Sequence, residues 1–412
     1  MQRKSTWAIY GIAILGFFML MEGLSYAGLF ALRTAAKIEY RTNPTRLSTE
    51  QRSLIENVVR RGGVNVGMDA ELGWTLAESN SAGMRDDQEH PAFPKSDMLR
   101  ISAFGDSFTF AADVDLAQSW GKQVASVNPS LEVLNYGMGG YGLDQAYLRY
   151  RRVATEYHPH IVFIGYMSEN IARNVNVYRI FYLPEYATNI LTKPRFQVKD
   201  GRLSLLKNPL PTREDYAALL RDDEAVLRRL GTNDYHYQMN SNAGALDFLA
   251  TVRFSKLFYR GINSRLLHPI FKSDGMYTVN SEAYDVTVHI FDAFYRDVLN
   301  NGALPVIVVF PDISDQNRNR QGKPRRYTPL IDNFRSKGYR FIDLLDAIQA
   351  EESRYEISEL TSKTFGHFSA LGNQIIAKHL VTQLGSFGLT DVSKVQDARD
   401  RERARLGVNQ SN

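Results

Sequence analysis

The chain has 412 residues, of which 44% are hydrophobic, and a formal net charge of +4. This length suits one large domain or two modest ones, and the composition is that of a globular protein. Lysines and arginines are scattered among acidic residues, so the sequence lacks the basic patch of a nucleic-acid-binding protein. Cysteine is absent, which excludes disulfides, thiolate metal sites and a cysteine nucleophile.

An apolar segment follows the short N-terminal tail of residues 1–6. Residues 7–32 carry a single charge, Glu22, and a helix of this length crosses a bilayer core of about 30 Å. A cleaved signal peptide is the alternative, because Ser25-Tyr26-Ala27 offers small residues for cleavage. The apolar run continues past that point, which favours an uncleaved signal anchor. Basic residues flank both ends and do not set the orientation, but a short tail before a large body resembles the usual signal anchor and predicts a periplasmic body.

Residues 33–96 form a predicted juxtamembrane helix and leader segment. Ser48-Thr-Glu-Gln51 is a capping box that opens a short amphipathic helix, and Gly62-Gly63 ends it. The irregular stretch that includes Glu71–Trp74 and Asn80–Arg85 is expected to pack against the main domain.

Five short apolar runs after residue 98 predict buried strands, with helical patterns such as Leu143–Tyr157 and Tyr284–Asn300 between them. Strands that alternate with helices predict an α/β fold with a parallel sheet covered on both faces. The predicted strands are Leu99–Phe104, Glu132–Asn135, His160–Gly165, Leu304–Phe310 and Tyr339–Ile342.

More than a hundred residues separate the third and fourth strands, far more than a crossover helix needs. The resulting insertion, residues 179–284, is predicted to be mainly helical and to contain a hairpin with a type I′ turn at Asp200-Gly201. The main domain is thus divided into residues 97–178 and 285–385. Residues 386–412 form a charged tail, predicted to be a solvated helix or disordered.

Four groups follow predicted strands or precede the last helix. In open parallel sheets, ligands bind beyond the carboxyl ends of the strands. Ser107 follows the first strand in Gly-Asp-Ser, and its hydroxyl could be a nucleophile or only cap a helix. Gly140 lies in a glycine-rich loop after the second strand, and Asn170 follows the third. His367 precedes the helical run Gln374–Leu384 and could act as a general base at neutral pH.

These four groups, in this order, resemble the SGNH or GDSL-type hydrolase family, named for Ser, Gly, Asn and His in four sequence blocks. The resemblance covers residues 97–178 and 285–385, and it implies a flavodoxin-like three-layer αβα sandwich. It implies that Ser107 is the nucleophile, that His367 is the base, and that Ser107, Gly140 and Asn170 provide the oxyanion hole. It requires no metal and no organic cofactor.

Two positions depart from the family pattern. The family places an aspartate three residues before its histidine, where this chain has Thr364. The site could then work as a dyad, recruit Asp343, Glu356 or Glu359, or be impaired. The third block can be aligned with its asparagine at Glu169 or Asn170, and Asn170 is preferred because a carboxylate would repel an oxyanion.

Four further residues near these blocks have weaker predicted roles. Asn174 is the fallback oxyanion donor, and Asp106 is a further candidate for a supporting role. His158 and His160 precede the third strand at the opposite edge of the sheet and are expected to be structural.

The resulting hypothesis is a membrane-anchored, extracytoplasmic serine esterase. The predicted partners are an acyl ester, which could belong to an acylated polysaccharide, and the lipid bilayer through residues 7–32; no nucleic acid is expected. One alternative is a polysaccharide O-acyltransferase that uses the same site. A second is a non-catalytic envelope scaffold, for which Thr364 in place of the acid would be a sign of decay.

Overall fold

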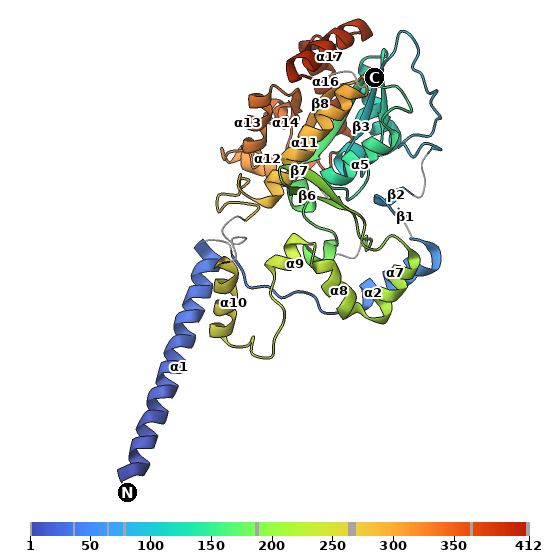
Figure 1. Cartoon of the computed structure of the whole chain (residues 1–412). Helices are drawn as coiled ribbons and strands as arrows, with labels where there is room; N and C mark the ends of the chain where they lie inside the picture. The colour runs from blue at the N-terminus through green and yellow to red at the C-terminus, as the bar shows by residue number, and fades with distance from the viewer. Residues whose placement is uncertain are drawn as a thin grey trace.

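The computed structural model describes residues 2–35, 38–63, 66–76, 80–185, 189–262, 269–362 and 366–408. A long helix, α1 (Gln2–Ala35), projects from the body of the protein (Figure 1). The body is built on a five-stranded sheet in the order β4-β3-β5-β8-β9, and every neighbouring pair is parallel. The strands are β3 (Leu99–Phe104), β4 (Leu131–Asn135), β5 (Ile161–Met167), β8 (Leu304–Phe310) and β9 (Phe341–Asp343).

This strand order, counted from the first strand of the sheet, is 2-1-3-4-5, the order of flavodoxin-like doubly wound folds. The fold class expected from the sequence is therefore confirmed. All five strands lie where the apolar runs predicted them, with ends that differ by at most two residues. Continuous apolar runs are typical of strands buried on both faces, and β3, β5 and β8 are buried at every position.

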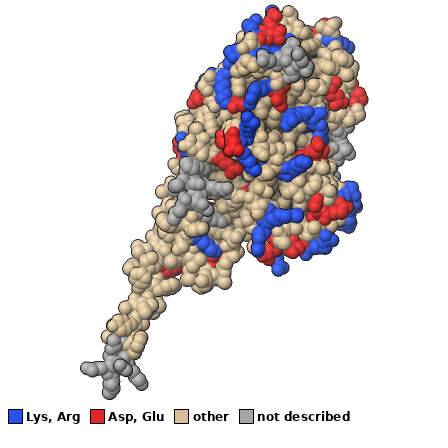
Figure 2. All heavy atoms as spheres, in the orientation of Figure 1, with Lys and Arg blue, Asp and Glu red and all other residues tan. Residues whose placement is uncertain are grey.

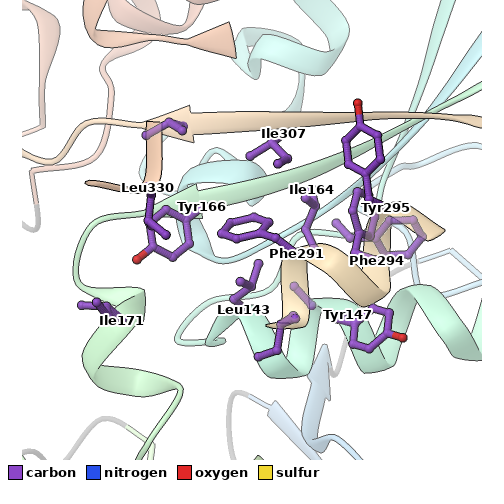
Figure 3. Packing of buried hydrophobic residues seen from close by; sticks show 14 of the residues in the cluster. Leu143, Tyr147, Ile164, Tyr166, Ile171, Phe291, Phe294, Tyr295, Ile307 and Leu330 are labelled. Carbon is purple, nitrogen blue, oxygen red and sulfur yellow. The ribbon is translucent and has the colours of Figure 1, made fainter. Parts of the chain in front are cut away.

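One face of the sheet is covered by α5 (Leu143–Val153), α11 (Glu282–Asn300) and α13 (Thr328–Lys337). Val162, Ile164 and Tyr166 point to this side because alternate residues of a strand face opposite ways. Figure 3 shows Phe291 of α11 among Ile164, Tyr166 and Leu143 of α5, and the Phe291 and Tyr166 ring centroids are 5.4 Å apart.

The opposite face is covered by α4 (Trp120–Val127), α14 (Leu345–Glu351) and α16 (Ala370–Ser386). Ile161, Phe163 and Met167, the alternate residues of β5, face this second core. Short helices lie at the strand ends and in the connections. They are α3 (Ser107–Phe110), η1 (Leu116–Gln118), α6 (Asn170–Arg173), η2 (Arg179–Phe181), α12 (Ile313–Arg320) and α15 (Ile357–Leu360).

The insertion contains the predicted hairpin, β6 (Arg195–Lys199) and β7 (Arg202–Leu206). Its turn residues Asp200 and Gly201 have φ of 50° and 70°, as a type I′ turn requires. The remaining helices of the insertion confirm its mainly helical character. They are α7 (Arg213–Arg221), α8 (Asp223–Gly231), α9 (Tyr235–Met239) and α10 (Ala250–Ile262).

The leader packs on the insertion and forms a third apolar core. The predicted capping box at Ser48 and Gln51 is present and opens α2 (Thr49–Arg61), which ends at Gly62 in the left-handed conformation. The antiparallel pair β1 (Val66–Asp69) and β2 (Gly73–Leu76) follows, and Trp74 is buried in the same core as Tyr216 of α7.

The charged tail forms a helix, α17 (Val392–Leu406), that is docked on the domain. The predicted helix is therefore confirmed, but one of its faces is buried on the domain instead of being fully solvated, and its residues are not disordered. Val395 and Ala398 are buried in the core beneath the sheet. Glu402 is also buried, where it accepts a hydrogen bond from the Tyr295 hydroxyl at 2.9 Å and pairs with Arg340 at 3.1 Å. These two partners allow a helix with few apolar residues to bury one face.

Docking of α17 predicts unequal effects for one substitution at two alanines of this helix. Ala398→Asp would bury a carboxylate without a partner and should lower the free energy of unfolding by about 2 kcal/mol or more. Ala404→Asp, on the exposed face, should have little effect. Urea unfolding of the two detergent-solubilised variants measures the difference, and equal stabilities would contradict docking.

Candidate active site

Ser107 lies at the carboxyl end of β3, as the first residue of the four-residue helix α3. The cap of this helix is Asp106, whose side chain accepts a hydrogen bond from the Phe108 backbone N–H at 2.9 Å. The sequence left open that the Ser107 hydroxyl only caps this helix. Asp106 caps it instead, so the Ser107 hydroxyl remains available for another contact. Ser107 is 9% exposed, so solvent reaches it only narrowly.

Two glycines allow α3 to sit tightly on the sheet. A Cβ added to Gly105 would lie 2.0 Å from the Thr109 Oγ1 atom, and one added to Gly165 would lie 1.9 Å from it. Side chains at these positions would therefore push α3 away from β3 and β5. The Trp120 indole N–H donates to the Thr109 carbonyl at 2.9 Å and holds the helix from the other side.

His367 reaches Ser107 from the far end of the chain. Its Nε2 atom lies 2.8 Å from the Ser107 Oγ atom. The loop that carries it is held by a hydrogen bond from the Ser362 N–H to the His367 carbonyl at 2.6 Å. Ser369 caps the following helix, α16, by accepting from the Gly372 N–H at 3.1 Å. The edge of the imidazole packs against Phe108, with ring centroids 5.0 Å apart.

The carboxylate of Asp113 binds the other nitrogen of the imidazole. Its Oδ2 atom lies 2.9 Å from the His367 Nδ1 atom and accepts a second hydrogen bond from the Ser362 hydroxyl at 2.5 Å. Burial alone would raise the pKa of Asp113, but the bonds from Ser362 and His367 lower it below the ordinary value. An ionised carboxylate only accepts hydrogen bonds, so Nδ1 donates to it and Nε2 is left to accept from Ser107. This is the tautomer that a general base requires.

Asp113 was not among the acids expected from the sequence. Thr364, at the family's usual acid position, lies outside the described residues. The suggestion of Asp343 is corrected, because its carboxylate binds Arg325 and accepts from the Tyr327 hydroxyl at 2.9 Å. The two glutamates considered are also engaged elsewhere. Glu356 pairs with Arg320 at 3.0 Å, and Glu359 accepts from the Glu356 N–H at 2.8 Å.

A tight turn after α3 brings Asp113 back to the site. Ala111 and Asp113 have φ of 60° and 69°, in the left-handed region that residues other than glycine seldom adopt. Arg85 from the leader holds this turn, because its guanidinium donates to the carbonyls of Phe110, of Ala111 at 2.6 Å and of Val114 at 2.5 Å. Residues other than glycine adopt the left-handed conformation mainly where the surrounding structure imposes it, and such residues often lie at functional sites.

Asn170 and Asn174 have different surroundings. Both polar atoms of the Asn174 side chain make structural hydrogen bonds: the oxygen accepts from the Leu143 N–H at 3.0 Å, and the amide nitrogen donates to the Thr287 hydroxyl at 2.8 Å. Asn170 is 1% exposed, and its amide lies beside the Asp106 carboxylate, whose pKa it lowers, without a hydrogen bond of good geometry to any group. A buried amide without such a partner is costly in a folded protein, so Asn170 is the better candidate for an oxyanion donor.

Gly140 lies in the loop after β4 and needs its glycine, because its φ is 81°. Its carbonyl accepts from Arg179 at 3.0 Å, which fixes the peptide group between Gly140 and Tyr141. The Trp74 indole N–H donates to the neighbouring carbonyl of Gly139 at 3.0 Å. The leader therefore supports both the acid turn and the glycine loop, which agrees with its expected packing on the main domain.

A buried ion network lies beside Asn170. Arg173 pairs with Glu169 at 2.9 Å and lies 3.7 Å from the Asp106 carboxylate. Burial would raise the pKa of Glu169, but Arg173 and Arg179 lower it to about 2. Glu169 is therefore a carboxylate, which supports the alignment that assigns the oxyanion role to Asn170 instead. Burial raises the pKa of Asp106, and Arg173 opposes that shift.

The histidines predicted to be structural lie at the amino end of β5. The His158 ring stacks on Phe93 with centroids 4.2 Å apart. The His160 Nδ1 atom accepts from the Arg100 N–H at 3.0 Å, and burial lowers the pKa of this imidazole. Neither side chain belongs to the group around Ser107.

Comparison of the sequence with protein-family models and with curated proteins finds no match. Among solved structures, the chain is similar to a member of the lipolytic protein G-D-S-L family from Veillonella parvula, at 11% identity and a TM-score of 0.32, over 69% of this chain and 96% of that one. It is similar to the lipase/acylhydrolase from Enterococcus faecalis, at 14% identity and a TM-score of 0.33, over 70% and 95%. It is also similar to an acetylxylan esterase from Geobacillus stearothermophilus, crystallised as a catalytic mutant, at 12% identity and a TM-score of 0.30, over 69% and 94%. Because these TM-scores lie below 0.5, the activity is inferred from the side chains of the site and not from these structures.

The contact of Asp113 with His367 predicts a large loss of activity in Asp113→Asn. The amide keeps the size of the side chain but cannot hold the same tautomer or stabilise the imidazolium, and kcat for a short acyl ester should fall by about 1000- to 10,000-fold. Glu356→Gln, which neutralises an exposed carboxylate among the alternatives, should keep near-normal kcat. The opposite pattern would show that Glu356, and not Asp113, is the acid.

The hydrogen bonds from Arg85 to the turn predict that replacing this side chain will misplace the Asp113 carboxylate. Arg85→Gln should lower kcat by about 10- to 100-fold, because the Asp113 carboxylate loses its fixed place. The value of KM should change less than kcat. Arg151→Gln, on the exposed side of α5, is the control. A normal kcat in Arg85→Gln, in a variant with unchanged circular dichroism, would show that the turn holds Asp113 without this clamp.

Proposed function

We propose that this chain is a serine ester hydrolase of the SGNH type, held at a membrane by α1. The observation that carries the proposal is the chain of contacts from Asp113 through His367 to Ser107, at 2.9 and 2.8 Å. Ser107 and the nearby Asp113 meet His367 from the far end of the chain, in the order and protonation state that acyl transfer needs.

The reaction begins when the Ser107 Oγ atom attacks the carbonyl carbon of an ester. His367 accepts the serine proton at Nε2, while Asp113 stabilises the imidazolium through Nδ1. The tetrahedral intermediate collapses, the bond to the alcohol oxygen breaks, and His367 donates its proton to the departing alcohol. Water then attacks the acyl-enzyme with His367 again as base, which releases the carboxylic acid and restores Ser107.

The negative oxygen of the intermediate requires donors that are already in place. Asn170 is one proposed donor, because its buried amide has only a poorly aligned contact with the Asp106 carboxylate in the free protein, and the backbone N–H groups of Ser107 and Gly140 are the others. Preorganised donors of this kind stabilise the transition state because they need no reorientation as charge develops.

The presence of Asp113 beside His367 weakens the case for a non-catalytic scaffold, since that alternative depended on the lack of an acid. Transfer of the acyl group to a sugar hydroxyl instead of water would use the same residues up to the acyl-enzyme. The apolar helix α1 is long enough to span a membrane, which supports the anchor. The proposal further places the enzyme outside the cytoplasm, where its substrate would be a cell-envelope ester such as an acylated polysaccharide.

A fluorophosphonate probe tests the nucleophile directly. The wild-type protein should be labelled at a single serine and should hydrolyse short acyl esters. Ser107→Ala should lose both, and His367→Ala should lose hydrolysis. Asn170→Ala should lower kcat by about 100- to 1000-fold, the usual effect of removing one oxyanion donor.

The matched control is Ser386→Ala, which removes an exposed serine on α16 and should change nothing. Undiminished labelling or hydrolysis in Ser107→Ala would refute the proposed nucleophile. A second assay mixes the enzyme with an acetylated glycan and a free acceptor sugar. Release of acetate supports hydrolysis, whereas acetylation of the acceptor sugar would identify the enzyme as an acyltransferase instead.

A further inference from the structure

The charge inside the apolar helix α1 has a defined partner. The carboxylate of Glu22 accepts hydrogen bonds from the first backbone N–H groups of α10, those of Ala250 and of Thr251 at 2.9 Å, and from the Thr251 hydroxyl at 2.6 Å. The first N–H groups of a helix lack partners within the helix and carry partial positive charge. Glu22 therefore caps a helix of the insertion from within the candidate membrane span.

The two helices continue side by side beyond this point (Figure 1). A Cβ on Gly28 would lie 2.6 Å from the ring of Phe254, so this glycine makes room for the aromatic side chain. Ser25, between the two contacts, is 5% exposed. Helix α10 thus covers one side of the upper part of α1, beginning at the level of Glu22.

The length of α1 fixes how deep this contact must lie. From Trp7 to Met21 the helix precedes the contact with α10, and these 15 residues extend about 22 Å at 1.5 Å per residue. The hydrocarbon core of a bilayer is about 30 Å thick, which requires about 20 residues. A span that begins at Trp7 then ends near Tyr26, so the level of Glu22 lies about 6 Å inside the hydrocarbon.

The segment around the start of α10 has the character that this depth demands. The side chains of Leu246, Phe248, Phe258 and Tyr259 are 57 to 73% exposed. The two opposite charges of this segment are paired with each other: Asp247 pairs with Lys256 at 2.5 Å and accepts from the Gly244 N–H at 2.8 Å, and both side chains remain partly exposed. Large exposed apolar side chains beside a paired acid and base suit a lipid boundary better than a water-exposed loop.

We propose that residues 245–259, the turn before α10 and the described side chains of that helix, form a second membrane contact whose partner is the lipid bilayer. Phe248 and Leu246 enter the hydrocarbon beside α1, and Phe258 and Tyr259 lie at the interface. Aromatic side chains favour this boundary. The inference rests on the anchoring role of α1 in the proposed function.

The contact would fix the body relative to the membrane. The chain that follows α1 pairs with the chain that leads to this segment, through hydrogen bonds from Asn43 N–H to the Ser241 carbonyl and from Ser241 N–H to the Arg41 carbonyl, both at 2.7 Å. A single helix would let the body rotate relative to the membrane. Two linked segments that both enter the membrane would hold the body in one orientation. Figure 2 fits this division, since the projecting helix shows little charge whereas the body shows both signs mixed.

The absence of native cysteine makes the test clean. Single-cysteine variants Phe248→Cys, Leu205→Cys and Ile14→Cys of the full chain are spin-labelled and reconstituted into phosphatidylcholine–phosphatidylglycerol nanodiscs. Collision rates with oxygen, which concentrates in lipid, and with a water-soluble nickel chelate report the depth of each label. Leu205 is an exposed leucine of β7 and serves as the aqueous control, and Ile14 is the lipid control.

The expected result is a high ratio of oxygen to nickel collisions at position 248, similar to position 14 and unlike position 205. A ratio at 248 equal to that at 205, with position 14 in lipid, would overturn this inference and leave the anchor intact. An aqueous position 14 would refute the anchor and this inference together, without touching the proposed esterase chemistry. Spin–spin broadening at 248 with low collision rates for both reagents would replace the bilayer with a second copy of the chain.

Discussion

The rest of the site depends on the two hydrogen bonds of the His367 imidazole, which binds Ser107 with one nitrogen and Asp113 with the other. Neither contact alone would define a base: without the carboxylate the tautomer is free, and without the serine the base has no proton to accept. The imidazole also lies against Phe108, so its ring plane is set by the same short helix that carries the nucleophile. The relative positions of Ser107, His367 and Asp113 therefore depend on how firmly α3 and the turn after it are held.

Several independent contacts provide that firmness. Gly105 and Gly165 let Thr109 approach the sheet, Trp120 holds the Thr109 carbonyl, and Arg85 closes the turn that carries Asp113. These residues come from the sheet, a covering helix and the leader before the domain. The leader is thus part of the site's support, although it lies outside the residues that resemble the hydrolase family. A strained left-handed turn persists only where its surroundings impose it, and Arg85 is the group that does so here.

Local patterns predicted the parts of the fold that local physics decides. Runs of valine and isoleucine gave the buried strands, Asp200-Gly201 gave the hairpin turn, and Ser48 with Gln51 gave the start of α2. Strand ends then indicated where Ser107 and His367 would meet. Asp113 escaped prediction because it lies 254 residues from His367 along the chain and because Ala111 gives no sign of a left-handed turn. The first acidic residue after so short a helix was the available signal. The docking of α17 was missed because Glu402 is buried through Tyr295 and Arg340, which are distant in sequence.

The bond between His367 and Asp113 is the central claim, and proton NMR of the detergent-solubilised protein tests it most directly. A proton shared between an imidazole Nδ1 atom and a carboxylate resonates far downfield of the amide region, and the His367→Gln variant assigns the signal. The account predicts such a resonance in the wild-type protein and in Glu356→Gln, and its loss in Asp113→Asn. A downfield His367 resonance that persists in Asp113→Asn would contradict the account, because another acid would then hold the imidazole.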